Sequence, residues 1–411
     1  MDIQTYLTTQ RDRLRQQSRE VKDYRVFDFA YVPAEPMIRP EAKPVVDALL
    51  RFDLTGVPSN LLVLGSRGSG KTLTMKHICS ILPKHTSLVM RYVNCRHHNT
   101  SHRILSHLLG GRCTGLSLGE LYERFVAAHA DQRLCLVLDE VDLMSPKDKR
   151  RELLYLLSRA ETPVMMILLS NNHKVTDQLD AATRSSMQLT SMLFRNYTPE
   201  QIESILEARA QEGLKSWDAA GLKQIAARTV RLTHADARVA IKTLFYLTPG
   251  MTPDPDPAPG PGMCQGENEL NAGKEQDVDA PKHTNSRISG GPVDHTPDIA
   301  TRVEHAFESA RRDIVLDMIS DLNDALLLIL RAVVTGESHL AKATYERYCR
   351  FSRELHEPPF SYVHYYASLA YLQSSGLVAL TATKLGRAYT NRVEPTFDGQ
   401  VVEPIVKLRF G

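Results

Sequence analysis

The chain has 411 residues, of which 42% are apolar and 24% are charged, and its formal net charge is +2. This balance fits a soluble globular protein of two or three domains, and no stretch of about eighteen apolar residues predicts a membrane span. Six cysteines form no C-x-x-C pair, which favours reduced thiols in a cytoplasm over a disulfide or zinc framework. The N-terminal residues also lack the apolar core of a secretory signal.

Residues 1–25 are expected to form a basic N-terminal helix, with six basic and three acidic residues between Arg11 and Arg25. Such a helix is either a solvated face or an arm that contacts phosphates, and we favour the solvated face. Residues 26–195 alternate apolar strands with amphipathic helices, which predicts a parallel sheet covered by helices on both faces. Residues 196–248 lose the strand pattern and predict a small helical lid, which starts at a Thr-Pro-Glu helix N-terminus.

Residues 249–297 are about one third proline or glycine, and too few apolar side chains remain to offset the entropy of ordering them. We therefore expect a disordered insertion there. Residues 298–320 resume the helical pattern and are expected to complete the lid and connect it to the C-terminal region. Residues 321–411 show the order helix, helix, strand, strand, which predicts a winged-helix domain.

The sequence GSRGSGKT, which ends at Thr72, matches the phosphate-binding pattern G-x-x-x-x-G-K-[ST]. An apolar strand precedes this loop and a helix follows it, as the pattern requires for binding a nucleoside triphosphate. Backbone amides of Gly68, Ser69 and Gly70 would surround the phosphates, because glycine adopts positive φ without cost. Lys71 would reach the β- and γ-phosphates and the Thr72 hydroxyl would bind Mg²⁺, so ATP and Mg²⁺ are the expected cofactors.

Further polar residues follow the strands that would flank this loop. The apolar strand LCLVLD runs into Asp139 and Glu140; Asp139 would hold Mg²⁺ and Glu140 would polarise the attacking water. The strand VMMILLS is followed by Asn171, which either orients that water or caps a loop. Arg238, in the first turns of a lid helix, can reach the γ-phosphate and report its loss, and the alternative is a surface arginine.

The order of these motifs resembles one known family. The phosphate-binding loop, LDEVD, SNN and ADARVAI, followed by a winged helix, are similar to the archaeal origin-recognition/cell-division-control initiators, which are AAA+ ATPases. The segments DFAYVPAEPMIRPEA, GVPSNLLVLG, YVNCRHHNT and NYTPEQIESILEARA add to the resemblance, which covers the chain except residues 249–297. It implies an α/β fold, an AAA+ P-loop parallel sheet with a helical lid, followed by an α+β winged-helix domain.

The resemblance also implies a function. ATP would bind between the α/β part and the lid, where Tyr197 and Arg209 would line the site. Slow hydrolysis is expected because the arginine that a neighbouring subunit would supply is the most eroded part of the family pattern in this chain. The family binds double-stranded DNA at replication origins and helps to recruit the replicative helicase. The expectation is thus a cytoplasmic, nucleoid-associated initiator that uses ATP as a conformational switch and can oligomerise on DNA. The alternative is an AAA+ adaptor or a diverged paralogue, whose winged helix binds protein or promoter or plasmid DNA.

A winged helix places its second helix in the major groove and its wing along the backbone or the minor groove. The candidate DNA contacts are Ser361, Tyr362, His364 and Tyr365 in that helix, with Lys384 and Arg387 in the wing turn. Tyr366 and Tyr371 recur at helical spacing with leucines and are expected in the core. Residues 321–411 carry ten basic and nine acidic side chains, so the domain is not strongly basic, and winged helices also bind proteins.

Three positions depart from the family pattern. The stretch LDAATRSSM at residues 179–187 stands where the family has LDPRVxSSL, which is linked to contacts with a neighbouring subunit's nucleotide. Arg184 is the only arginine left there, so a trans-acting arginine and stimulation by self-assembly are in doubt. The segment before TGLSLGELYERF is short where the family carries a second DNA contact, and Arg67 is an unusual residue within the phosphate-binding loop.

Overall fold

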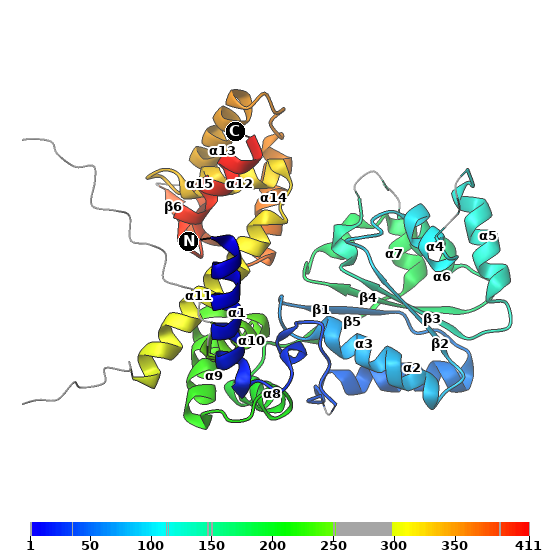
Figure 1. Ribbon diagram of the computed structural model, residues 1–411. Coiled ribbons are helices and arrows are strands. Elements are labelled where there is room, and N and C mark those ends of the chain that lie inside the picture. Colours follow the sequence, from blue (N-terminus) through cyan, green and yellow to red (C-terminus); the bar gives the residue numbers. More distant parts are fainter. Residues whose placement is uncertain are drawn as a thin grey trace, which may run out of the picture.

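The computed structural model describes residues 2–34, 36–111, 113, 115–145, 148, 151–249, 251, 298–385 and 388–410. Figure 1 shows a body built on a parallel sheet, a helical region beside it, and a second small body of helices and a two-stranded hairpin. The expected insertion lies almost entirely outside the described residues. In the ranges given above, no helix has both the length and the apolar character needed to cross a membrane.

The sheet has five strands that pair in parallel in the order β2-β3-β4-β1-β5. Their bounds are β1 (Leu61–Gly65), β2 (Val89–Asn94), β3 (Leu134–Asp139), β4 (Val164–Ser170) and β5 (Thr190–Phe194). β3 and β4 are buried along their whole length, as expected for inner strands covered on both faces. The register places Asn94 beside Asp139 and Leu64 beside Ser170. The residues that follow β1, β3 and β4 therefore meet at one edge of the sheet.

Helices cover both faces of this sheet (Figure 1), and alternate side chains of its strands divide between two apolar cores. Val137 and Ile167 point to the first core, which α2 (Ala42–Thr55) and α3 (Lys71–Ile81) enclose. Leu136 and Leu168 point to the second core. The helices around the second core are α4 (Ser101–Leu108), α5 (Leu118–Ala128), α6 (Glu152–Ser158) and α7 (Ala181–Met187).

The lid is helical, as the sequence predicts. Its helices are α8 (Pro199–Gly213), α9 (Ala219–Thr233), α10 (Ala237–Leu247) and, across the undescribed insertion, α11 (Ile299–Ser320). α8 begins with a reciprocal cap, in which the side chains of Thr198 and Gln201 each accept a backbone N–H of the other. α11 packs on α10 through Phe307 and Tyr246, so the residues after the insertion belong to the lid core.

The segment before the sheet and several connections contain further helices, of which α1 has 15 residues and the others have three or four. They are α1 (Ile3–Gln17), η1 (Ser18–Glu20), η2 (Tyr24–Phe27), η3 (Leu82–Lys84), η4 (Val141–Leu143), η5 (Val175–Gln178) and η6 (Gly399–Val401). Of these, η2 is held against the lid: Val26 is fully buried, and a Cβ added at Gly213 of α8 would lie 2.2 Å from its Cγ2. The segment that follows α1 therefore packs on the lid before the chain reaches the sheet.

The C-terminal body has the winged-helix arrangement. Its elements are α12 (Asp324–Val334), α13 (Ala341–Glu354), α14 (Tyr362–Ser374), β6 (Val378–Leu385), β7 (Ala388–Pro395) and α15 (Val402–Phe410). β6 and β7 form an antiparallel hairpin that pairs Val378 with Pro395. The sequence reading did not include α15, which packs on α12 and is joined to it by an ion pair between Arg331 and Glu403 at 2.8 Å.

The expected orientation of α14 is wrong by one residue. Tyr365, expected to contact DNA, is fully buried, and its hydroxyl lies 2.5 Å from the hydroxyl of Thr344. Tyr366, expected in the core, is 37% exposed, whereas Tyr371 is half-buried and packs against the core as expected. The buried face of α14 consists of Tyr365, Ser368, Leu369 and Leu372, at the i, i+3, i+4, i+7 spacing of a helix. Tyr366, the residue after Tyr365, lies outside that face.

The buried position of Tyr365 makes a prediction about stability. Tyr365→Ala leaves a cavity in the winged-helix core and is expected to lower the free energy of unfolding of the full chain by ~3 kcal/mol or more. Val363→Ala, on the exposed side of the same helix, is the matched control and is expected to change it by less than about 0.5 kcal/mol. Denaturant unfolding measures both. Equal effects of the two substitutions would contradict this placement of α14.

Candidate nucleotide-binding site

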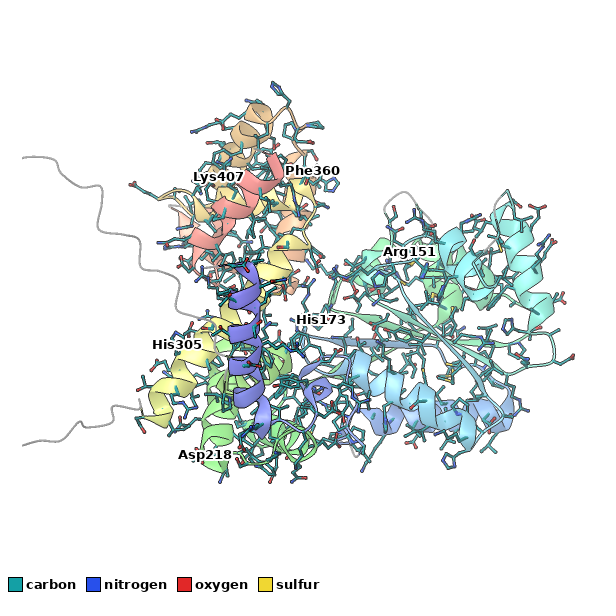
Figure 2. All side chains as sticks on the ribbon, in the orientation of Figure 1. Arg151, His173, Asp218, His305, Phe360 and Lys407 are labelled. Carbon is teal, nitrogen blue, oxygen red and sulfur yellow. The ribbon has the colours of Figure 1, made fainter. Side chains whose placement is uncertain are left out.

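A cleft of about 980 Å³ lies where the strands β1, β3 and β4 end. Its lining includes the phosphate-binding loop, the segment before α2, residues of α2 and α3, the ends of β3 and β4, the lid, and the end of α11. Figure 2 shows His173, close after the end of β4, on the side of the sheet that faces the lid and α11. The cleft therefore lies between the sheet and the C-terminal half of the chain.

Lys71 is the central side chain of the phosphate-binding loop. Its Nζ donates to the carbonyl oxygens of Gly65 at 2.9 Å and Ser66 at 2.8 Å, and to Asn171 Oδ1 at 2.8 Å. These acceptors match the three N–H groups of an ammonium. Burial lowers the pKa of Lys71 to about 8, because a low-dielectric site disfavours the charged form. A phosphate in the cleft would supply the missing negative charge at this position.

The residues expected to hold Mg²⁺ lie together. The Thr72 hydroxyl and the Tyr92 hydroxyl each donate to Asp139 Oδ2 at 2.7 Å. Burial raises the pKa of Asp139, which a bound cation would reverse. A hydroxyl and a carboxylate are ligands that suit Mg²⁺, which takes its remaining ligands from phosphates and water. No group of three or more His, Cys, Asp or Glu side chains that could hold a metal ion occurs within the described ranges.

Glu140, the expected water-activating residue, is held by an arginine. Its Oε2 accepts from Nε of Arg96 at 2.9 Å, and Nη1 of Arg96 donates to Asp321 Oδ2 at 2.8 Å. The Glu140 backbone has φ of 54°, a left-handed conformation that costs energy for any residue except glycine. Asp321 ends α11, so one guanidinium joins the candidate catalytic residue to the junction with the winged-helix domain.

The lid contacts the phosphate-binding loop at two glycines. A Cβ added at Gly70 would lie 1.9 Å from the hydroxyl oxygen of Tyr197, and one added at Gly68 would lie 2.0 Å from Asp236 Oδ1. Both glycines have positive φ, 84° and 72°. Asp236 also forms an ion pair at 2.5 Å with Arg238, the expected γ-phosphate sensor. Arg238 and Tyr197 both line the cleft, so the lid reaches both ends of the loop.

Arg209 lines the cleft, but its guanidinium binds the protein backbone. It donates to the carbonyl oxygens of Val26, of Asp28 at 2.9 Å and of Tyr31 at 3.0 Å. Burial lowers its pKa to about 10, because the carbonyl groups replace water only in part. In this structure Arg209 fixes the segment before the sheet on the lid, and its contact with a nucleotide stays a prediction.

The sequence reading named no role for Arg39 and Glu41, which hold the start of the lid. Arg39 is 2% exposed and its guanidinium carbon lies 4.2 Å from the centre of the Tyr197 ring. Its Nη2 donates to the Arg195 carbonyl at 2.5 Å, while Glu41 Oε1 accepts the Arg195 N–H at 3.3 Å. The R-x-E pattern in the segment MIRPEA was the available signal. Arg96 and Tyr92 were missed as well, since nothing in their sequence spacing marks them.

Of the residues expected to contact DNA, those at the start of α14 lie together, while Lys384 lies in the hairpin. Tyr362 and His364 are exposed at the N-terminal end of α14, where the Ser361 side chain caps the helix by accepting the His364 N–H at 3.4 Å. Figure 2 shows the neighbouring Phe360, on which the His364 ring stacks, on the flank of the winged-helix domain toward the sheet. Lys384 is exposed and belongs to β6 instead of the turn. Arg387 lies outside the described residues.

Comparison with known proteins supports the prediction of an AAA+ domain. Residues 56–179 match the family described as AAA domain. The chain is 33% identical over 233 residues to the ORC1-type DNA replication protein 1 of Sulfurisphaera tokodaii, a match that covers 52% of this chain and 58% of that protein. The protein of the same name from Aeropyrum pernix is 33% identical over 210 residues, with 46% and 52% covered. The chain is thus similar in sequence to ORC1-type DNA replication proteins over about half of its length.

Similarity to solved structures extends the comparison to the whole fold. The Aeropyrum pernix ORC1 protein in complex with DNA has a TM-score of 0.62 at 24% identity, and 95% of this chain and 98% of that chain are covered. The Aeropyrum pernix ORC2 protein, in its ADPNP-ADP complexes, has a TM-score of 0.56 at 19% identity, with 95% and 99% covered. By sequence the chain spans little more than half the length of the relatives it matches. The resemblance expected from the motifs is thus confirmed, and so is the fold class.

The contact between Gly70 and Tyr197 can be tested with a matched pair of glycines. Gly70 and Gly115 have nearly the same φ, 84° and 83°, but a Cβ at Gly115 would meet no atom within 4 Å. Both alanine substitutions therefore carry a similar backbone cost, of about 1 kcal/mol. Gly70→Ala is also expected to displace Tyr197 and to weaken ATP binding by at least about tenfold, because backbone amides of this loop bind the phosphates.

Titration calorimetry with ATP measures the effect, and Gly115→Ala is expected to bind ATP as the unchanged protein does. Equal ATP affinity in the two variants would show that Tyr197 does not limit the shape of the loop.

Proposed function

We propose that this chain is an ATP-dependent DNA-binding protein that recognises replication origins and regulates the initiation of DNA replication, with ATP as a conformational switch. The observation that carries the proposal is the ion-pair connection from Glu140 through Arg96 to Asp321, at the junction between α11 and the winged-helix domain. The names of the similar proteins support the same function. Such a protein would work at the nucleoid.

The residues of the cleft divide the work of ATP hydrolysis. Lys71 would bind the β- and γ-phosphates, while Thr72 and Asp139 would hold Mg²⁺, which supplies positive charge to the phosphates. Asn171 would orient the attacking water and Glu140 would accept its proton. In this structure Glu140 is held by Arg96, and this ion pair has to open before the carboxylate can approach the attacking water. Turnover is therefore expected to be slow.

The same arginine would make the site sensitive to the position of the winged helix. The two ion pairs of Arg96 have similar lengths, 2.9 Å to Glu140 and 2.8 Å to Asp321. A rotation of the winged-helix domain that separates Asp321 from Arg96 would leave the guanidinium paired with Glu140 alone. Because α11 packs on the lid helix α10, a movement of the lid would also displace Asp321. Coupling of this kind is reciprocal, so DNA binding and ATP binding would affect each other.

A second function, a protein-docking AAA+ adaptor, is favoured by one observation. α14 contains no lysine or arginine, although phosphate contacts dominate DNA affinity. It exposes apolar and aromatic side chains instead: Val363 is 79% exposed, Tyr362 43% and Tyr366 37%. Tyrosine is enriched both at protein interfaces and in contacts with nucleotides. Recruitment of the replicative helicase would be one use of such a face.

Salt dependence separates the two functions. For origin binding, we expect the full chain with ATP to bind duplex DNA, with affinity falling linearly in log-log form as salt increases, by a slope of about −0.9 per phosphate contacted. Fluorescence anisotropy with duplexes from the organism's own genome measures it. ATP binding without any duplex binding at low salt would contradict the origin-binding proposal and support the adaptor.

A further inference from the structure

The arginines of the cleft differ in whether the protein itself neutralises them. Among the described residues, five arginines line the cleft: Arg39, Arg67, Arg96, Arg209 and Arg238. Three of them pair with carboxylates, at 3.3 Å for Arg39, 2.9 Å for Arg96 and 2.5 Å for Arg238. Arg209 is occupied by backbone carbonyls. In the described part of the chain, Arg67 is the cleft arginine with no hydrogen bond, ion pair or aromatic contact.

Arg67 lies in the first half of the phosphate-binding loop, between Ser66 and Gly68. The residue before it, Ser66, accepts a hydrogen bond from Lys71 Nζ through its carbonyl, and the residue after it, Gly68, abuts Asp236 beside Arg238. Lysine in this motif reaches the β- and γ-phosphates. The other end of the loop, at Gly70, faces Tyr197. Arg67 therefore leaves the loop on the side of the terminal phosphate.

Few arginines remain in the segment from which a neighbouring subunit would supply one. Residues 179–187 retain one arginine, Arg184. Its Nη2 donates to the carbonyl oxygens of Thr176 at 2.9 Å and Leu179 at 3.4 Å. These bonds join η5 and Leu179 to the middle of α7, so one nitrogen of the exposed guanidinium is used within its own loop. Transfer of a phosphoryl group nevertheless spreads negative charge over three oxygens, which an arginine acting in cis or in trans stabilises.

We propose that Arg67 binds the γ-phosphate in cis and replaces the arginine of a neighbouring subunit. The inference rests on the proposed ATPase site and adds that one molecule carries all the positive charge the reaction needs. In that reaction the water oxygen bonds to the γ-phosphorus, and the bond from this phosphorus to the β–γ bridging oxygen breaks. The water proton passes to Glu140, and the products are ADP and inorganic phosphate.

The test measures nucleotide affinity and turnover on the full chain. Arg67→Ala is expected to weaken ATP binding by about tenfold or more, the usual effect of losing a hydrogen bond to a charged group, and to change ADP affinity by less than about twofold. Turnover is expected to fall by ~10³-fold, toward the level of Glu140→Gln. In the unchanged protein, turnover per molecule is expected to be independent of protein concentration, since no neighbour contributes.

Three variants serve as controls. Arg91→Ala removes an exposed arginine of β2 outside the cleft and is expected to keep both affinities and turnover. Arg67→Lys keeps the charge and is expected to recover part of the ATP affinity. Arg184→Ala tests the alternative that this arginine acts in trans, and it is expected to leave turnover unchanged. Thermal unfolding checks that the variant and the unchanged protein have the same folded fraction.

Two results would overturn the proposal. One is equal loss of ATP and ADP affinity in Arg67→Ala, which would mean that Arg67 only shapes the loop. The other is turnover that rises with protein concentration and is lost in Arg184→Ala, which would mean that the arginine acts in trans. Either result would leave the ATP-dependent DNA-binding function standing, whereas failure of the unchanged protein to bind ATP would contradict that function itself.

Discussion

The buried ammonium group of Lys71 is the constraint on which the site depends. An ammonium removed from water needs an acceptor for each N–H, and these come from Gly65 at the end of β1, from Ser66 in the loop, and from Asn171 after β4. The loop is therefore fixed to two adjacent strands. Because the strands are parallel and end at one edge, the same arrangement brings Asp139 beside Thr72.

Paired charges surround this centre. Two of the pairs, Arg39 with Glu41 and Arg238 with Asp236, are local in sequence, whereas those of Arg96 are long-range. Arg39 and Glu41 hold the start of the lid at Arg195, and Arg238 with Asp236 sets the lid against Gly68. Arg96 connects Glu140 to Asp321, 225 residues away in sequence from Arg96. Of these residues, Asp236 abuts the phosphate-binding loop, while Arg96 connects the candidate catalytic residue to the end of α11. The proposed switch would use this second connection to reach the winged helix.

Sequence patterns predicted the residues that belong to a local motif or to the end of a strand. They failed where tertiary packing determines which side chains are buried or paired. The loop, Asp139, Glu140 and Asn171 could be found because parallel strands place their ends together. α14 could not be oriented, because tyrosines occupy both its buried and its exposed faces and hydrophobicity does not separate Tyr365 from Tyr366. α15 is short and has no cap signal. The partnership of Arg96 with Asp321 has no sequence signature, since it depends on how two domains meet.

The proposed switch requires that the nucleotide cleft and the winged helix be coupled through Arg96 and Asp321. Its most direct test is the affinity of the full chain for origin duplex DNA with a non-hydrolysable ATP analogue and with ADP, in the unchanged protein and in Asp321→Asn. The two nucleotides are expected to give different DNA affinities in the unchanged protein. In Asp321→Asn the ratio of the two DNA affinities is expected to be close to one. The same ratio in both proteins would contradict it.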